Sequence, residues 1–376
     1  MANNGSNGRA LYPTVGILGM LWALVASMRS KMPVLFEGSP GVGKSSVIRQ
    51  FALWAGLESE MLIPSHHDPV DVAGFPVVQN GHVSREPMQS VRRACEKGTV
   101  LGIDEMWNCQ ASMQAVLQEL MLDRKAGDLL LHADTMTVGA TNSIEESTGG
   151  MERALALRGR VAMLCLRPTT DEVLAYFRRK PIAIPAAEIA PHDAVAYEDA
   201  VEVSMGNFAA CAEFDERLVQ VDPTEDALNN GAQYGSPRNW ERGLRLWVAS
   251  MLAGAPEDVS WKLLAGCVGD SCMVGFRAIT DLRNGMPQPQ DILSAPDKAM
   301  VPGDRTKQIG AMILLPRIAE QDVFAAWIYS ARLQPEIGLA LARALQTRPP
   351  KGSSPHAAAG QRVRVAQLAK LAAGRV

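Results

Sequence analysis

The sequence has little of several features that would place a protein in a special class. Its six cysteines form no CxxC pair, and most of them lie inside apolar stretches. This pattern excludes a disulfide framework, disfavours a zinc site and indicates the reduced thiols of a cytoplasmic protein. The net charge is only −3, whereas proteins that coat nucleic acid are usually strongly basic. No internal repeat occurs in the sequence.

The remaining composition is that of a globular protein with a sizeable core. Hydrophobic residues make up 47% and charged residues 20%, which excludes disorder over most of the length. A chain of 376 residues predicts two or three domains, at roughly 150 residues per domain. The charge-free stretch Leu11–Met28 has nearly the length of a membrane span, but Pro13, Gly16 and Gly19 interrupt it. It therefore predicts a buried N-terminal helix and no membrane role.

A glycine-rich stretch, GSPGVGKSS at residues 38–46, lies between a short apolar run and a segment of helical periodicity. In this strand–loop–helix context, a GxxxxGK[ST] pattern binds phosphate through successive backbone N–H groups. Lys44 would neutralise the β- and γ-phosphates of ATP, and the Ser45 hydroxyl would ligate Mg²⁺. The candidate nucleotide-binding residues are Gly38, Ser39, Pro40, Gly41, Val42, Gly43, Lys44, Ser45 and Ser46.

Two later apolar runs end in polar residues that suit the same site. Thr99–Ile103 is followed by Asp104 and Glu105, and Thr135–Ala140 is followed, one residue later, by Asn142. Asp104 can hold Mg²⁺, and Glu105 can polarise the attacking water. The Asn142 amide could orient that water or contact the γ-phosphate, although Asn also ends many strands as a turn residue. Ligands of parallel sheets bind at the carboxyl ends of the strands, where all these side chains are expected.

Strands and helices alternate over some 130 residues, from Pro33 to Leu166, and helical patterns follow. The expected strands are Pro33–Phe36, Leu57–Pro64, Thr99–Ile103, Thr135–Ala140 and Val161–Leu166, with helices at Val47–Trp54 and Cys109–Leu122 and a hairpin at Pro76–Arg85 that turns at Asn80-Gly81. This alternation predicts an α/β fold with a doubly wound parallel sheet. Thr169 and Glu172 form a capping box that starts a new helix, and the patterns stay helical to about Thr347.

With these motifs the chain resembles the AAA+ ATPases, and within them the MoxR-like group. The resemblance covers roughly residues 12–255 and rests on the phosphate loop at 38–45, Asp104-Glu105 with QAVLQELM at 114–121, GATN at 139–142, GSPRN at 235–239 and the hairpin at 76–85. It implies a P-loop NTPase fold with an α-helical lid domain after the sheet. It also implies a ring, commonly a hexamer, with ATP and Mg²⁺ bound between subunits.

The same resemblance implies roles for three residues. Asn142 corresponds to sensor 1, and Arg238 corresponds to sensor 2, the lid residue that reaches back to the nucleotide. Arg160 is the expected arginine finger, which would fork onto the γ-phosphate held by a neighbouring subunit. Arg158 and Arg153 are the alternatives for this role.

These observations divide the chain into five predicted segments. They are a flexible N-terminus at 1–10, an αβα nucleotide-binding core at 11–167, a helical lid with sensor 2 at 168–255, a helical C-terminal extension at 256–347, and a Pro/Gly linker with a basic tail at 348–376. We expect the tail, which has five cations and no acid after residue 348, to be solvated. Docking on an acidic partner or nucleic acid is the alternative for it.

The expected function is a ring-forming ATPase that remodels or activates a protein partner. MoxR-like ATPases often work with proteins that carry a von Willebrand factor A domain, so such a partner is implied. A nucleic-acid motor and a nucleotide-switched scaffold are the alternatives. The acidic balance of residues 1–348 argues against the motor, and the presence of Glu105 and Asn142 argues against a pure switch.

Two further polar groups have simpler interpretations than a second site. His66-His67-Asp68 with Asp71 has the residue types of a metal site, but adjacent side chains do not easily converge on one ion. A solvated or hydrogen-bonded loop is expected there. The cations Arg178–Lys180 lie at a predicted helix end, where they complement the helix dipole, and this role is favoured over a nucleic-acid contact.

Overall fold

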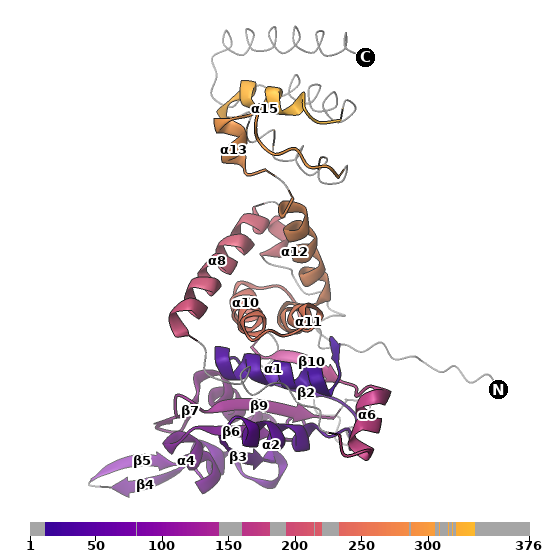
Figure 1. The fold of residues 1–376 in the computed structure, drawn as a ribbon. Helices are drawn as coiled ribbons and strands as arrows, with labels where there is room; N and C mark the ends of the chain where they lie inside the picture. Colours follow the sequence, from indigo (N-terminus) through magenta and orange to yellow (C-terminus); the bar gives the residue numbers. More distant parts are fainter. Residues whose placement is uncertain are drawn as a thin grey trace, which may run out of the picture. The chain divides into compact units, whose positions relative to one another are not determined.

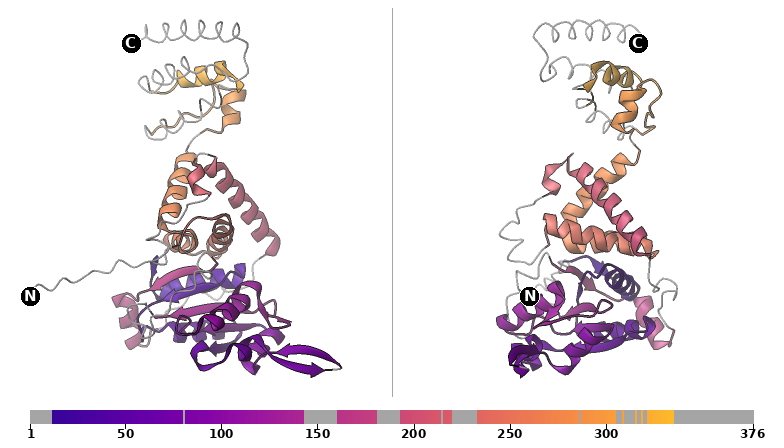
Figure 2. Two further views of the ribbon diagram at one scale, coloured as in Figure 1. Left: turned by 180° about the vertical axis from the view of Figure 1, so that it is seen from behind. Right: turned by 90° about the vertical axis from the view of Figure 1, so that its left-hand side faces the viewer.

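The computed structural model describes residues 12–79, 81–142, 160–180, 193–213, 215–219, 233–285, 287–304, 308, 315, 318 and 321–334. The chain divides into two compact units, Met1–Phe276 and Arg277–Val376 (Figures 1 and 2). The first unit contains every candidate site residue. The N-terminus predicted to be flexible at 1–10 and the basic tail predicted at 348–376 lie outside the described residues.

Six parallel strands form the sheet of the first unit. From one edge to the other they are β1 (Thr14–Val15), β10 (Ala162–Leu166), β2 (Val34–Glu37), β9 (Met136–Thr141), β6 (Thr99–Ile103) and β3 (Glu58–Leu62). All neighbouring strands are parallel, so each connection within the sheet is a crossover. The strands β2, β6, β9 and β10 are buried along their whole length, which explains their unbroken apolar runs. The predicted doubly wound α/β sheet is confirmed.

Helices cover this sheet. α1 (Ile17–Ser30) contacts β2 and β9, α2 (Lys44–Trp54) contacts β3, β6 and β9, and α4 (Gln89–Glu96) contacts β3 and β6. The short η1 (Pro64–His66) and α3 (Pro69–Ala73) precede a hairpin, and α5 (Ala111–Gln118) continues into a π-helical turn, η2 (Glu119–Asp123). This last segment corresponds to the helix predicted at Cys109–Leu122, and it contributes Met113, Leu117, Leu120 and Met121 to one buried core cluster.

Two antiparallel hairpins project from the core. β4 (Phe75–Gln79) pairs with β5 (His82–Glu86), and β7 (Lys125–Ala126) pairs with β8 (Leu129–Leu130). The first is the hairpin predicted at residues 76–85. Asn80 of its predicted turn lies outside the described residues, whereas Gly81 has a φ of +81°, the left-handed conformation that such turns require of glycine.

The later part of the first unit is helical. It contains α6 (Thr170–Phe177), α8 (Ala194–Ala212), η4 (Glu216–Leu218), α10 (Pro237–Leu252), α11 (Glu257–Val268) and the start of α12 (Asp270–Arg283). α10 packs against α1, α8 and α11, and α11 also packs against β10, so the predicted boundary at 255/256 separates two helices in contact. The second unit contains the rest of α12, α13 (Pro289–Ser294) and α15 (Val323–Ser330).

Several element ends differ from the predicted ones. The predicted N-terminal helix is α1, which starts only at Ile17 because the preceding residues pair with Cys165 and Leu166 as strand β1. α2 starts at Lys44, inside the glycine-rich stretch, three residues before the predicted start at Val47. Within the described part of the chain, no helix is long and apolar enough to cross a membrane.

Candidate active site

The glycine-rich loop lies between the end of β2 and the start of α2. Gly41 and Gly43 have φ angles of +80° and +98°, and no heavy atom lies within 4 Å of an added Cβ at either position. Glycine is therefore required there for backbone conformation, and open space remains beside the loop. At Gly38, by contrast, a Cβ would lie 2.7 Å from the carbonyl oxygen of Leu166. The Gly38 N–H donates to Thr141 O at 3.2 Å, which fixes the loop against β9.

Lys44 is the first residue of α2, and its side chain is buried beneath the loop. Its ammonium group donates to Gly38 O at 2.6 Å, Ser39 O at 3.0 Å and Asn142 Oδ1 at 3.0 Å. The N-terminus of α2 directs its first backbone N–H groups and the positive end of the helix dipole to the same place. The loop thus combines a fixed cation with an anion-binding helix end.

Ser45 and Asp104 lie in direct contact across the site. The Ser45 hydroxyl donates a short hydrogen bond to Asp104 Oδ2, and the other carboxylate oxygen accepts the Glu105 N–H at 2.9 Å. The Asp104 N–H donates to Leu62 O at 2.8 Å, so the strand register with β3 extends one residue beyond β6. A hydroxyl and a carboxylate in contact are the oxygen ligands that Mg²⁺ prefers.

Glu105 has a backbone conformation that non-glycine residues seldom adopt. Its φ is +53°, in the left-handed region, which costs of order 1–2 kcal/mol. Hydrogen bonds hold it there, because its N–H donates to Asp104 Oδ1 at 2.9 Å and its carbonyl accepts the Asn108 N–H at 2.9 Å. The next residue, Met106, donates its N–H to Ala140 O on β9. The turn therefore places the half-buried Glu105 side chain directly after Asp104, which with Ser45 forms the pair of oxygen ligands suited to Mg²⁺.

The sheet order explains why these residues meet. β2, β9 and β6 are neighbours, and all three are parallel, so their carboxyl ends lie at one edge. That edge carries Lys44 and Ser45 after β2, Asn142 after β9, and Asp104 and Glu105 after β6. The structure thus brings together the five polar residues for which the sequence predicts a common site.

Arg160 lies at the opposite, amino edge of the sheet. It precedes β10, whose first residue pairs with Val34 at the start of β2, whereas the loop follows the other end of β2. Because β2 has four residues, its two ends lie roughly 13 Å apart, and this length separates the level of Arg160 from that of the loop. The Arg160 guanidinium donates to Gln118 Oε1 at 3.5 Å, and its carbonyl accepts from Arg242 Nη1 at 2.6 Å. The alternatives Arg158 and Arg153 lie outside the described residues.

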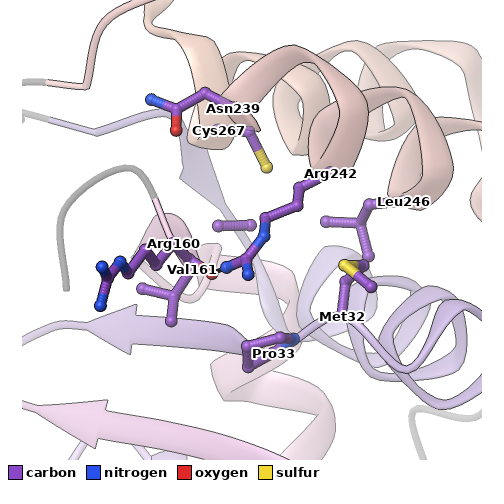
Figure 3. A pocket seen from close by; sticks show the side chains of 9 residues that line it. Met32, Pro33, Arg160, Val161, Asn239, Arg242, Leu246 and Cys267 are labelled. Atoms are coloured by element: carbon purple, nitrogen blue, oxygen red, sulfur yellow. Dashed lines mark hydrogen bonds between the residues drawn. The ribbon is translucent and has the colours of Figure 1, made fainter. Parts of the chain in front are cut away.

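Arg238 lies at the start of α10, where its charge acts on Arg242, the residue that donates to Arg160 O. It is the second residue of α10, which begins after the N-cap Ser236. The following Asn239, together with Arg242, lines a small cavity whose other walls come from the amino ends of β2 and β10 (Figure 3). These walls are Met32, Pro33, Arg160, Val161 and Ala162, with Leu246 and Cys267 behind them. The N-terminus of α10 therefore belongs to the amino edge.

Arg242 is a site residue that no sequence motif identified. Burial lowers the pKa of its guanidinium, and the neighbouring charges of Arg238 and Arg160 lower it further. Arg242 Nη1 also donates to Arg160 O at 2.6 Å, and Arg238 precedes it by one helical turn, so three arginines gather at this edge. The sequence signal that could have identified Arg242 is its spacing, because Arg238 and Arg242 are four residues apart and therefore share one face of a helix.

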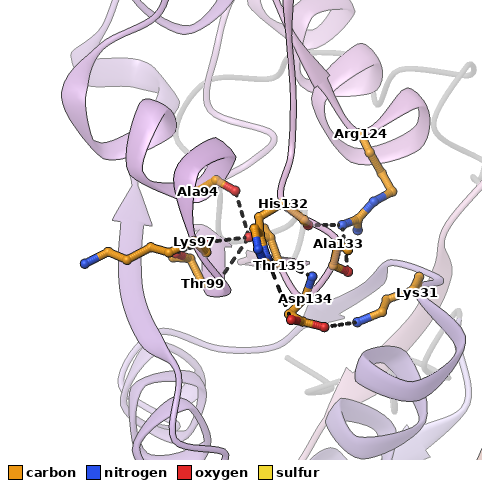
Figure 4. Close-up of polar contacts among 9 residues, drawn as sticks. All are labelled: Lys31, Ala94, Lys97, Thr99, Arg124, His132, Ala133, Asp134 and Thr135. Carbon is orange, nitrogen blue, oxygen red and sulfur yellow. Dashed lines mark hydrogen bonds and ion pairs between the residues drawn. The ribbon is translucent and has the colours of Figure 1, made fainter.

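A second polar cluster also lies at the amino edge (Figure 4). Asp134, two residues before β9, pairs with Lys31 at 4.0 Å, and Arg124 donates to His132 O at 2.7 Å. Burial lowers the pKa of both cations, and the Asp134 carboxylate opposes this effect. Thr135 Oγ1 donates to Ala94 O at 2.7 Å and ties the turn to α4. Positive charge is therefore not confined to the three arginines of this edge.

The loop His66–Asp71 shows hydrogen bonding without a metal site. The side chains of Asp68 and Asp71 form the capping box of α3, and His67 Nδ1 lies 3.9 Å from Asp71 Oδ2. Among the residues that the structure describes, no three His, Cys, Asp or Glu side chains are grouped to hold a metal ion. The capping box agrees with the hydrogen-bonded loop expected from the sequence.

Comparison with known proteins agrees with this geometry over the core. Residues 33–160 match the family described as AAA domain (dynein-related subfamily). No curated protein matches the chain in sequence. A solved structure from Cytophaga hutchinsonii, named as a candidate ATPase, has a TM-score of 0.41 and 14% identity, and the match covers 71% of this chain and 90% of that one. A full-length MCM homologue from Methanopyrus kandleri has a TM-score of 0.36 and 15% identity, with 70% and 55% covered.

The two structural likenesses are too weak to carry an argument about function, and the chain spans about half of the second protein. The family match is different, because its range holds the loop, the acidic pair, Asn142 and Arg160. Residues 33–160 thus match an AAA domain, and the sheet has the P-loop α/β fold. The chain is an ATP hydrolase.

Proposed function

We propose that the chain is a MoxR-like AAA+ ATPase that assembles into a hexameric ring and couples ATP hydrolysis to the remodelling or activation of a protein partner. One observation carries the proposal: the charged groups are divided between the two edges of one sheet. The loop with Asp104 and Glu105 lies at the carboxyl edge, and Arg160 lies at the amino edge. A single chain leaves the two apart, whereas a head-to-tail contact between chains would unite them.

The carboxyl edge fits ATP with Mg²⁺. The open space beside Gly41 and Gly43 leaves the loop N–H groups accessible to phosphate oxygens. Ser45 and Asp104 would hold Mg²⁺, which would supply charge neutralisation for the phosphates. Lys44 would exchange its loop carbonyls for the β- and γ-phosphate oxygens. Glu105 would take the proton of the attacking water, and the Asn142 amide would orient that water.

The amino edge would complete the site of the next subunit. Arg160 would spread the charge that develops on the γ-phosphate, as a positioned guanidinium does. We assign Arg238 to the same neighbouring site, because α10 begins beside Arg160 and not beside its own loop. This assignment differs from the expectation that Arg238 reaches back to the nucleotide of its own chain. Arg158 and Arg153 stay alternatives for the finger.

The partner that we propose is a protein, with a von Willebrand factor A domain as the first candidate. We retain the segments expected from the sequence, with a core at 11–167, a lid at 168–255 and an extension at 256–347. The six cysteines are free thiols, and five of them are buried, which supports the proposed cytoplasmic location.

The test mixes two inactive variants. Arg160→Ala should bind ATP but lose turnover by about 10³-fold, the scale of a lost arginine finger. Glu105→Gln should also bind without efficient turnover. In mixed rings, some interfaces join an intact Glu105 to an intact Arg160, so activity should return. Failure to recover, in rings shown to be mixed by native mass spectrometry, would mean that Arg160 does not act across an interface.

A further mixture locates Arg238. If Arg238 and Arg160 belong to the same side of an interface, rings of Arg160→Ala and Arg238→Ala chains lack one arginine at every site and stay inactive. If Arg238 serves its own nucleotide instead, some sites regain both arginines, and activity returns. ATPase assays with single-stranded DNA, RNA or a candidate partner would then separate a motor from a protein remodeller.

A further inference from the structure

The outer face of α6 is apolar, aromatic and followed by cations. None of its residues is buried, and Tyr176 and Phe177 are 76% and 75% exposed, with their rings 5.6 Å apart. The exposed cations Arg178, Arg179 and Lys180 follow immediately, and no ion pair joins them to another described residue. Such a face is unusual on a solvated helix, because exposed aromatic clusters mark interaction sites.

Hydrogen bonds hold the start of α6. Thr169 caps α6, and one Glu172 carboxylate accepts both the Thr169 N–H and the Leu18 N–H at 2.8 Å. The second of these bonds ties α6 to the first turn of α1. The start of the helix is therefore fixed on α1, so a partner would meet a helix that is already formed.

The outer face of α8 has the opposite charge. Its inner face buries Tyr197, Val201, Ser204 and Cys211. At helical spacing, the residues opposite these are Val195, Asp199, Glu202 and Val203, all exposed, with the two valines 70% and 65% exposed. Neither Asp199 nor Glu202 forms an ion pair with a described residue, whereas the adjacent Glu198, which is also exposed, pairs with Arg245 of α10 at 3.0 Å.

We propose that the α6 face of one copy docks on the outer α8 face of a second copy. The cations after α6 match the acids of α8, and the aromatic rings match the exposed valines. Two covered aromatic side chains would bury roughly 300–500 Å², about half of what a standard interface needs from one partner. The two helices lie on opposite flanks of their unit (Figures 1 and 2).

Because the two patches differ, the contact is heterologous, and such contacts build rings or helical filaments. The inference rests on the proposed ring and names the surfaces that hold it together. Neither patch belongs to the nucleotide site, so the assembly can be perturbed without changing the residues that bind ATP.

Charge reversal tests the contact. Arg178→Glu/Arg179→Glu and Asp199→Arg/Glu202→Arg should each weaken assembly with Mg²⁺-ATP by about 10²-fold in concentration, since like charges would face each other. A chain with all four changes should assemble again, and so should an equimolar mixture of the two double variants. Arg217→Glu, an exposed reversal outside both faces, is the control. Mass distribution is measured by sedimentation, with ATP-analogue binding and thermal unfolding as checks on the fold.

Each outcome decides a different question. Unchanged assembly in either double variant overturns the α6–α8 contact. Weakened assembly that neither the fourfold variant nor the mixture restores shows that the two faces do not contact each other, and also overturns the proposal. A parent chain that hydrolyses ATP but stays monomeric at all concentrations refutes the ring itself. Arg160 complementation without α6–α8 rescue would leave the proposed function intact and remove only this interface.

Discussion

Replacing Asn142 by Asp should weaken ATP binding by adding a charge at the place where phosphate must go. Asn142 Oδ1 already lies 3.0 Å from the Lys44 ammonium, so the substitution is nearly isosteric and converts a hydrogen bond into an ion pair. The new carboxylate would compete with phosphate oxygens for Lys44 and would repel them directly. Asn142→Leu, of similar shape, removes the amide without adding charge and is the matched control.

The separation of the two groups sets the magnitude. At 3.0 Å, unit charges attract by about 1.4 kcal/mol with the dielectric constant of water and by about 5.5 kcal/mol with an effective value near 20. Desolvation of the new carboxylate offsets part of the larger figure. We therefore expect ATP affinity to fall by about 10²-fold in Asn142→Asp, equivalent to roughly 2.7 kcal/mol.

Asn142→Leu should behave differently. Lys44 keeps the carbonyls of Gly38 and Ser39, so ATP affinity should stay within about fivefold of the parent value, equivalent to one modest hydrogen bond. Turnover should nevertheless fall by about 10²-fold, because a positioned polar group near the reacting phosphate is lost.

The assay is titration of each variant with a fluorescent ATP analogue and Mg²⁺ at pH 7.5, followed by steady-state ATPase measurement. Thermal unfolding of each variant checks that the fold is retained. Parent-like affinity in Asn142→Asp would refute the reasoning, since the added charge would then lie away from the phosphates. Equal losses in the Asp and Leu variants would also refute it, because the amide and not the charge would then determine binding.

Three further predictions concern the catalytic acid, the packing of the helices and one thiol. Glu105→Gln should bind ATP normally and hydrolyse it at least ~10²-fold more slowly, and near-parent turnover would assign the water to another residue. Gly266→Ala should destabilise the fold by roughly 1–3 kcal/mol in urea unfolding, because the added Cβ would lie 2.9 Å from Met163 O. At Gly206 no heavy atom lies within 4 Å of an added Cβ, so Gly206→Ala should stabilise the fold by up to ~1 kcal/mol. Shifts of the same sign would contradict this. Burial raises the pKa of Cys267 to about 12, so its thiol stays protonated at pH 8 and should resist iodoacetamide until the protein unfolds, as peptide mapping would show.

Much of the nucleotide site was predictable because its signals are local. The glycine spacing, Lys44 and Ser45 occur within one strand–loop–helix segment, and each later apolar run ends directly in its polar residue. Parallel strands align their carboxyl ends, so the sequence pattern alone assigns Asp104 and Asn142 to one edge. The unusual φ of Glu105 was not predictable, since hydrogen bonds to Asp104 and Asn108 impose it.

The amino edge depended on tertiary packing. Spacing shows that Arg238 and Arg242 share a helix face, but it does not say which edge of the sheet that face meets. The docking of α10 and α11 on α1 and β10 decides it, through contacts between segments more than 70 residues apart, such as the partly buried hydrogen bond of Arg242 with Arg160. By itself, the sequence thus determined the phosphate loop and the polar residues around it, because the conformation of each of these segments depends on residues close to it in the sequence. Only the tertiary structure placed the arginines, because their position follows from the packing of distant helices.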